Sequence, residues 1–149
     1  MLDSVLTYYP IFLDLRDVPV LVVGGGKVAL RKTRGLIEAG ARVTVVAPEL
    51  DAEFASLSVH IVPRRFRVPD LTGARLVFAA TDDRRTNRRI GMAARDRAIF
   101  ANIADAAEEC SFLVPSRLQR GNLQIAISTG GVNPRVSAEL RRKLEKILM

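Results

Sequence analysis

The feature that most constrains the fold is an apolar run followed at once by three glycines. Residues 18–23 are continuously apolar and rich in valine, which is typical of a strand covered on both faces. Gly24-Gly25-Gly26 ends this run, and residues 24–29 match the pattern G-x-G-x-x-G/A. A helix is predicted directly afterwards, over residues 27–39. Strand, glycine turn and helix in this order predict the first βαβ unit of a parallel sheet.

The same alternation continues to about residue 105. Further strands are predicted over residues 41–46, 59–62, 75–80 and 99–103, with a short helix over 49–55 and a longer one over 84–97. Gly40 is expected to end the first helix, and Thr81, Asp82 or Asp83 to cap the helix that begins at Arg84. This pattern predicts an α/β protein, with a Rossmann-like domain and its parallel sheet in residues 1–113.

Residues 114–149 follow a different pattern. A β-hairpin is predicted from strands over 111–118 and 123–128 joined by a turn at 120–122, and a helix is expected to start at Asn133-Pro134. Apolar residues recur at one helical face: Val136, Leu140, Leu144 and Ile147. A hairpin and one helix are too small for a core of their own, so this face covers either the first domain or a second copy. We favour a homodimer, with residues 114–149 as its dimerisation region.

Composition excludes several classes of protein. The 149 residues are 48% apolar and 26% charged, as in an ordinary globular protein. The apolar runs are shorter than the roughly 20 residues of a membrane span. The N-terminus lacks the basic start and apolar stretch of a secretory signal, so we expect a cytoplasmic protein without a membrane partner. With one cysteine, Cys110, and one histidine, His60, no disulfide framework and no metal site are expected.

The net charge of +7 comes mostly from arginine, which provides 19 of the 23 basic residues. Two clusters stand out, at residues 64–67 and 84–89. Such a surface attracts polyanions, and arginine pairs well with carboxylates and phosphates. Nucleic acid is the obvious rival partner, but aromatic residues that could stack on bases are scarce and are not interleaved with the arginines. We therefore expect a small anionic ligand and no nucleic acid.

The glycine pattern predicts a dinucleotide site with a clear physical basis. Gly24 permits the tight turn, Gly26 lets the backbone approach a pyrophosphate, and Ala29 allows close packing of helix on strand. Free N–H groups and the helix dipole then bind the anion. The carboxylate that usually ends the second strand is missing, so the residues alone leave NAD and NADP open. The expected contacts are Gly24, Gly25, Gly26, Lys27, Val28, Ala47, Pro48, Glu49, Thr81 and Asp82.

Two further segments carry candidate chemistry. Asp105 follows the fifth predicted strand, at the sheet edge where ligands of such folds bind. It is either a general base or a loop aspartate in an Asx turn. Ser128, Thr129 and Gly130 either place hydroxyls and amides beside a ligand or simply connect a strand to a helix.

Taken together, four groups of residues resemble one known family. They are 9–15 leading into the glycine loop and Arg31-Lys32; 80–83 with Asn87; 102–105 followed by 110–115; and 127–131 with Asn133-Pro134 and Arg141. In this order they are similar to the precorrin-2 dehydrogenase and sirohydrochlorin ferrochelatase family, the N-terminal module of siroheme synthases. The resemblance covers nearly the whole chain.

The resemblance implies an enzyme of siroheme biosynthesis, which oxidises precorrin-2 to sirohydrochlorin with NAD as the cofactor. It implies that Asp105 is catalytic, that the chain forms a homodimer, and that some members also insert Fe²⁺ into the tetrapyrrole. We further expect Ser128, Thr129 and Gly130 to contact the substrate, a polycarboxylate that suits an arginine-rich protein. The alternative is a Rossmann module that binds NAD(H) or a tetrapyrrole without turnover. This sequence lacks the helical segment with which the family usually continues, and the methyltransferase domain of the fused form.

Overall fold

The computed structural model describes residues 7–148, which form two compact units. The first, called the sheet unit here, spans residues 13–112. The second, called the hairpin unit, contains residues 113–148 together with residues 7–12. The sequence-based division at 113/114 placed these N-terminal residues in the Rossmann-like domain. The structure groups them with the hairpin instead, and they form no strand of the main sheet.

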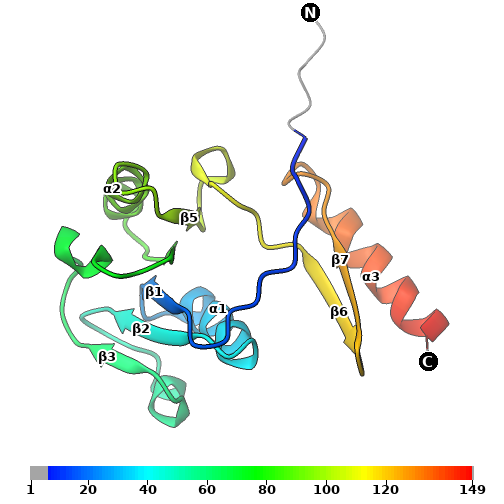
Figure 1. The fold of residues 1–149 in the computed structure, drawn as a ribbon, viewed down its shortest axis with the longest axis horizontal. Coiled ribbons are helices and arrows are strands. Elements are labelled where there is room, and N and C mark those ends of the chain that lie inside the picture. The colour runs from blue at the N-terminus through cyan, green and yellow to red at the C-terminus, as the bar shows by residue number, and fades with distance from the viewer. Residues whose placement is uncertain (1–6, 149) are drawn as a thin grey trace, which may run out of the picture. The chain divides into compact units, whose positions relative to one another are not determined.

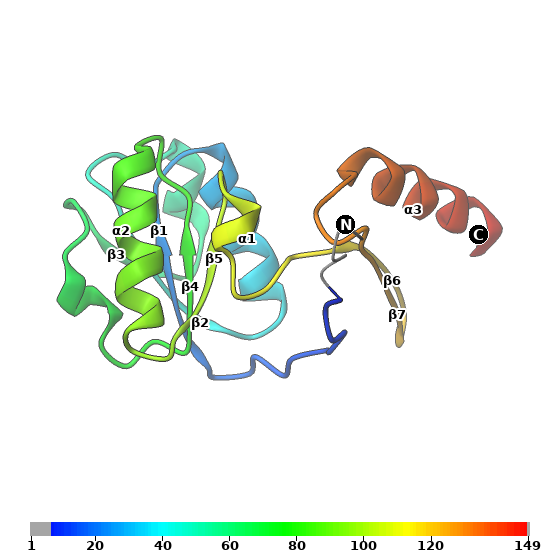
Figure 2. The ribbon, with the colours of Figure 1, turned by 90° about the horizontal axis from the view of Figure 1, so that it is seen from above.

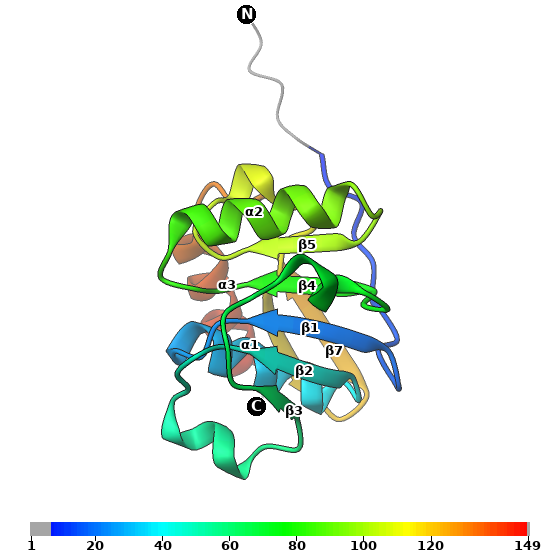
Figure 3. The ribbon, with the colours of Figure 1, turned by 90° about the vertical axis from the view of Figure 1, so that its left-hand side faces the viewer.

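The sheet unit is built on the expected parallel sheet. Its strands stand side by side in the order β3-β2-β1-β4-β5 (Figure 3) and are all parallel. Because they are parallel, all the strands end at one edge of the sheet, the edge where ligands of such folds bind. The strands are β1 (Pro19–Val23), β2 (Arg42–Val46), β3 (His60–Val62), β4 (Leu76–Ala79) and β5 (Phe100–Ile103).

Two helices cover opposite faces of this sheet (Figure 2): α1 (Lys27–Glu38) and α2 (Arg84–Arg95). Along β1, Val20 and Val22 point into the apolar cluster that contains α1 residues, while Leu21 and Val23 point into the cluster beneath α2. Burial on both faces explains why β1 is apolar throughout rather than alternating. Each such side chain contributes roughly 1.5–3 kcal/mol by burial.

The two helices end and begin at defined signals. Gly40 follows α1 with a φ of +82°, and its N–H donates to the carbonyl oxygen of Ile37 at 2.9 Å, so the expected stop is confirmed. Of the caps expected for α2, Asp83 is confirmed and the other two are not. The carboxylate of Asp83, rather than Thr81 or Asp82, accepts bonds from the N–H groups of Arg85 and Thr86. Asp83 directly precedes the helix with extended backbone, which is the geometry a cap requires.

Three short 3₁₀ helices complete the sheet unit: η1 (Ala52–Ser56), η2 (Val68–Leu71) and η3 (Ala107–Glu109). The short helix expected over 49–55 is η1, which begins at Ala52. The other two were not predicted, because a single turn is too short to show a helical period. Phe54 in η1 and Leu71 in η2 are fully buried and anchor their turns to the core.

The hairpin unit contains an antiparallel pair, β6 (Ser116–Arg120) and β7 (Leu123–Ile127), followed by α3 (Pro134–Leu148) (Figure 1). The first strand was expected over 111–118 but begins at Ser116. Residues 111 and 112 are bonded back to β5 instead, with the N–H of Ser111 donating to Ala101 at 2.8 Å. The helix starts at Pro134 as predicted, and Asn133 accepts a bond from the N–H of Val136 at 3.3 Å.

The apolar face of α3 is exposed. Ser137 is the buried residue of this helix, whereas Val136 and Leu140 are about 40% exposed and Ile147 is 76% exposed. Val132, just before the helix, is also exposed. Within the described part of the chain, no helix combines the length and the apolar character that crossing a membrane requires.

Candidate functional site

The glycine loop connects the end of β1 to the start of α1, and its first two glycines are required by backbone packing. Gly24 has a φ of +128°, which residues with a side chain rarely adopt. A Cβ there would lie 2.2 Å from the carbonyl oxygen of Ala80. A Cβ on Gly25 would lie 1.9 Å from the carbonyl oxygen of Glu49. The loop is therefore pressed against the segments that follow β4 and β2.

Gly26 differs, because a Cβ built there would meet nothing within 4 Å. It is the N-cap of α1, and no side chain caps the helix. The first N–H groups of α1 are thus available to an anion, and the helix dipole favours one. Ala29 is fully buried against the sheet, as the pattern required. These features fit the pyrophosphate of a dinucleotide.

The residues after β2 line the same loop. Ala47 is buried, Pro48 and Glu49 are exposed, and Glu49 touches the loop through its carbonyl group rather than its carboxylate. The carboxylate tied to the loop is Asp51, whose Oδ2 lies 2.8 Å from Lys27 Nζ and whose N–H donates to Gly25 at 2.7 Å. The Lys27 ammonium holds the pKa of Asp51 below its usual range.

Asp51 was missed in the sequence. Its signal is weak, an acidic residue just before the short turn of η1, which it caps by accepting a bond from the N–H of Glu53. Lys27 also pairs with Glu53, at 3.1 Å.

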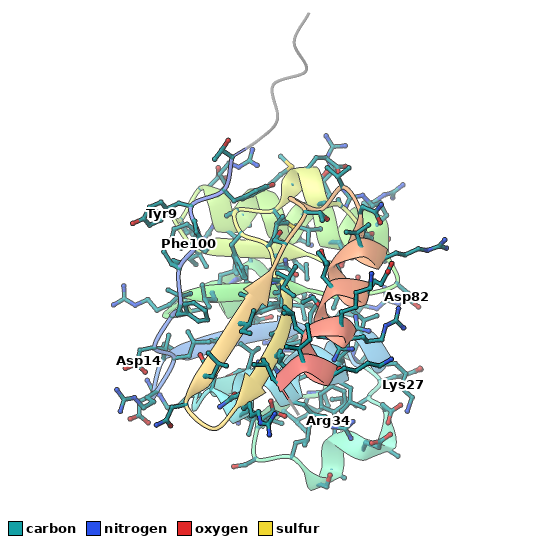
Figure 4. The ribbon with its side chains drawn as sticks, turned by 90° about the vertical axis from the view of Figure 1, so that its right-hand side faces the viewer. Tyr9, Asp14, Lys27, Arg34, Asp82 and Phe100 are labelled. Carbon is teal, nitrogen blue, oxygen red and sulfur yellow. The ribbon has the colours of Figure 1, made fainter. Side chains whose placement is uncertain are left out.

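The segment after β4 is held by a buried amide. Asn87 on α2 is fully buried, and its Oδ1 accepts bonds from the hydroxyl and the N–H of Thr81, at 2.6 and 3.1 Å. Its Nδ2 donates to the Thr81 carbonyl at 3.0 Å. Asp82 is exposed, and it lies with Lys27 at the edge of the unit where β1 and β4 end (Figure 4).

Asp105 follows β5 at that same edge. Its side chain is 39% exposed, and its Oδ1 accepts a bond from Arg84 Nη1 at 3.2 Å. Arg84 also pairs with Glu109, which raises the pKa of the guanidinium. Arg84 had been recognised only as part of an arginine cluster. In the described part of the chain, the bond to the Asp105 carboxylate comes from this side chain rather than from a backbone N–H of its own turn.

Ser128, Thr129 and Gly130 lie in the hairpin unit, between β7 and α3. The Ser128 hydroxyl accepts a bond from the N–H of Gly130 at 3.1 Å, and the Thr129 hydroxyl accepts one from Asn133 at 3.0 Å. Gly130 has a φ of +66°. The Thr129 hydroxyl also accepts a bond from the Ser137 hydroxyl at 3.5 Å. The two hydroxyls therefore shape this turn, and the O–H of Thr129 remains available to donate to another partner.

Some arginines of the two clusters form ion pairs, and others line a hollow on the surface. Arg64 forms a bidentate pair with Asp70, at 2.7 and 2.9 Å, and Arg84 binds the Asp105 loop. On the outer face of α2, a shallow hollow of about 450 Å³ is lined by Val68, Arg85, Arg88, Arg89, Met92, Ala93, Asp96 and Arg97. Among the described residues, no group of three His, Cys, Asp or Glu side chains is arranged to hold a metal ion.

The sheet order, the glycine turn and the open start of α1 together define a dinucleotide-binding domain of the Rossmann type. A family described as "Putative NAD(P)-binding" matches residues 11–116, and one described as "Sirohaem biosynthesis protein central" matches residues 120–147. The chain therefore belongs to this NAD(P)-binding family, in the branch found in siroheme biosynthesis, as its resemblance predicted.

Individual relatives agree with this assignment. The chain is 47% identical over 147 residues to siroheme synthase 3 of Aeromonas hydrophila subsp. hydrophila and 41% identical over 144 residues to siroheme synthase of Methylococcus capsulatus. These alignments cover 96% and 94% of this chain, but only 31% and 30% of the relatives. The chain thus spans about a third of the length of these proteins.

Among solved structures, the precorrin-2 dehydrogenase SirC matches with a TM-score of 0.81 and 29% identity. The match covers 94% of this chain and 71% of that one. The predicted fold class is confirmed, and NAD as the cofactor is supported by the family description and by this neighbour.

Proposed function

We propose that this protein is an NAD-dependent dehydrogenase that oxidises precorrin-2 to sirohydrochlorin. One structural observation carries the proposal: the open, uncapped start of α1 and the exposed Asp105 carboxylate lie at the same edge of one sheet. The similarity to SirC supplies the substrate. The oxidation removes a hydride and a proton from the tetrapyrrole, so the site needs a hydride acceptor and a base.

Each part of the site has a role in this proposal. The N–H groups that begin α1 bind the pyrophosphate at Gly26, where no side chain intrudes. NAD⁺ bound at this loop would supply the hydride acceptor, and the residues of the chain would position it. Asp105 takes the proton as general base. Arg84, which donates to Asp105, holds the carboxylate in one orientation.

The remaining expected contacts belong to the same proposal. Gly24, Gly25, Lys27, Val28, Ala47, Pro48, Glu49, Thr81 and Asp82 line the cofactor site, and Ser128, Thr129 and Gly130 contact the substrate. The hairpin unit forms a homodimer through the exposed apolar face of α3. We also propose two domains divided near residue 113, a cytoplasmic location, and Fe²⁺ as a second substrate. Iron insertion needs no protein metal site, because the tetrapyrrole nitrogens are its ligands.

The test is an anaerobic turnover assay with the purified protein, enzymatically generated precorrin-2 and NAD⁺. We expect NADH and the sirohydrochlorin spectrum to appear together. Addition of Fe²⁺ then tests the insertion step against a control without enzyme. A folded protein that binds NADH but produces none would refute the dehydrogenase and favour the alternative, a module that binds NAD(H) or a tetrapyrrole without turnover.

A further inference from the structure

One half-buried charge in the sheet unit is not explained by the dinucleotide site. Lys32 lies on the face of α1 that covers the sheet, and burial lowers the pKa of its ammonium group. Among residues 7–148, the structure gives this ammonium no carboxylate partner. Its contacts are a hydrogen bond from Nζ to Asn102 Oδ1 at 2.9 Å and the ring of Phe78, whose centre lies 5.4 Å away.

A lysine in this position lowers the stability of the fold. Removing an ammonium from water without a carboxylate partner costs free energy, and an apolar side chain of similar length would pack against Phe78 without that cost. Residues that reduce stability in this way are commonly kept for function.

Asn102, the hydrogen-bond partner of Lys32, connects both ends of the Asp105 loop. It is buried in β5, three residues before Asp105. Its Nδ2 donates to the carbonyl oxygen of Phe112 at 3.1 Å and lies 3.7 Å from the Cys110 sulfur, both beyond the loop. Asn102 therefore joins the strand that enters the loop to the segment that leaves it.

Cys110 closes the same loop from its far end. Its sulfur accepts a bond from the N–H of Ile103 at 3.1 Å and lies 3.4 Å from the carbonyl oxygens of Ile103 and Ala106. Burial raises the pKa of this thiol, which keeps it protonated and able to donate. Next to it, Ser111 and Ala101 exchange two further bonds, at 2.8 and 3.2 Å.

We infer that Lys32 is a positioning residue that fixes the Asp105 loop relative to α1, the helix whose first turn receives the cofactor. The Lys32–Asn102 hydrogen bond is the direct link between that helix and the base of the loop. Hydride and proton transfer require the cofactor and the base to be held in one geometry, and a displacement of about 1 Å can cost on the order of 100-fold in rate. This role rests on the proposed function of Asp105.

The test compares Lys32→Met with the wild type and with two other variants in the full chain. Lys32→Arg keeps the charge and the donors. Arg95→Gln removes one charge at the exposed end of α2 and serves as the matched control. For Lys32→Met we expect kcat to fall at least about tenfold, with the Kd for NADH changed less than about twofold. The melting temperature should change by less than about 5 °C, because the Asn102 oxygen left unpaired offsets the gain from removing the ammonium. Lys32→Arg should recover most of the rate.

A second readout does not depend on turnover. Amide hydrogen exchange should accelerate at Ile103 and Ser111, which close the Asp105 loop, in Lys32→Met but not in Arg95→Gln. This measurement tests the link between helix and loop even if the wild-type protein fails to oxidise precorrin-2, an outcome that would overturn the proposed function separately.

Three results would overturn the positioning role. A melting temperature that falls by more than about 5 °C together with kcat, in both Lys32→Met and Lys32→Arg, would show that Lys32 is simply structural. A raised KM for precorrin-2 at unchanged kcat would mean that the ammonium binds the substrate directly. Unchanged exchange at both amides would show that the hydrogen bond does not hold the loop.

Discussion

The two units of this chain differ in how much of their apolar surface is buried within the chain. In the sheet unit, both faces of a parallel sheet are covered by helices of the same chain, and strands such as β1 and β4 are almost completely buried. In the hairpin unit, α3 leaves most of its apolar face exposed. The first unit contains its own core and carries the proposed cofactor site and Asp105. The second depends on something outside itself, and we propose that this is a second copy.

The largest expected effect tests how rigid the sheet unit is. In Gly25→Ala, the new methyl group would collide with the backbone of Glu49, which cannot move without disturbing the end of β2. We expect a loss of about 3 kcal/mol or more in the free energy of unfolding and a loss of dinucleotide binding. Denaturant unfolding and NADH titration measure the two effects.

Gly26→Ala is the matched control, because its methyl group meets no protein atom. Its stability should stay within about 1 kcal/mol of the wild type, while NADH binding weakens because the methyl group occupies the place of the pyrophosphate. If both variants bind NADH normally, the loop is not the cofactor site. If both variants lose the same free energy of unfolding, Gly25 is not packed more closely than Gly26.

A second experiment tests the hairpin unit. Leu140→Glu places a charge on the exposed apolar face of α3, which should raise the dimer dissociation constant more than about tenfold. Arg142→Glu, on the polar side of the same helix, is the control and should leave the dimer largely intact. Sedimentation velocity distinguishes the species. A wild type that is monomeric at all concentrations would refute the proposal that a second copy covers the apolar face of α3.

The smallest expected effect concerns the rim of the sheet unit. The Arg64 guanidinium holds the pKa of Asp70 below its usual range. Since the folded pKa is the lower one, this pair stabilises the protein above the unfolded pKa of about 4 and the contribution is lost as the pH falls further.

Asp70→Asn should therefore cost about 1 kcal/mol at pH 7 and reduce the loss of stability on acidification. Urea unfolding of both proteins between pH 7 and pH 3 measures this. Identical pH profiles for the two proteins would show that the ion pair contributes nothing.

The sequence was most informative where a local pattern decides the structure. The apolar run, the glycines and the helical periods located the five strands of the parallel sheet and the three α-helices to within a few residues. The single-turn helices η2 and η3 escaped, because they are too short to have a period. The start of β6 was also misplaced, since long-range bonds from residues 111 and 112 to β5 replace strand pairing there.

The residues of the candidate site also differ in how well the sequence predicts them. The glycine loop and Asp105 follow from their place after strands, which the sequence shows. Three pairings could not be predicted: Lys27 with Asp51, Arg84 with Asp105, and Lys32 with Asn102. The two residues of each pair are between 21 and 70 positions apart in the sequence. Such contacts depend on how the elements pack, and no single-sequence pattern encodes them.

In the proposed function, Asp105 is the base for an NAD-dependent oxidation. The most direct test compares the rate of anaerobic NADH formation from precorrin-2 by the wild type and by Asp105→Asn, with NADH affinity and melting temperature measured for both. We predict a loss of about 100-fold or more in kcat, with unchanged affinity and stability, because the substitution removes only the proton acceptor. An Asp105→Asn protein that forms NADH at the wild-type rate would show that Asp105 is not the base.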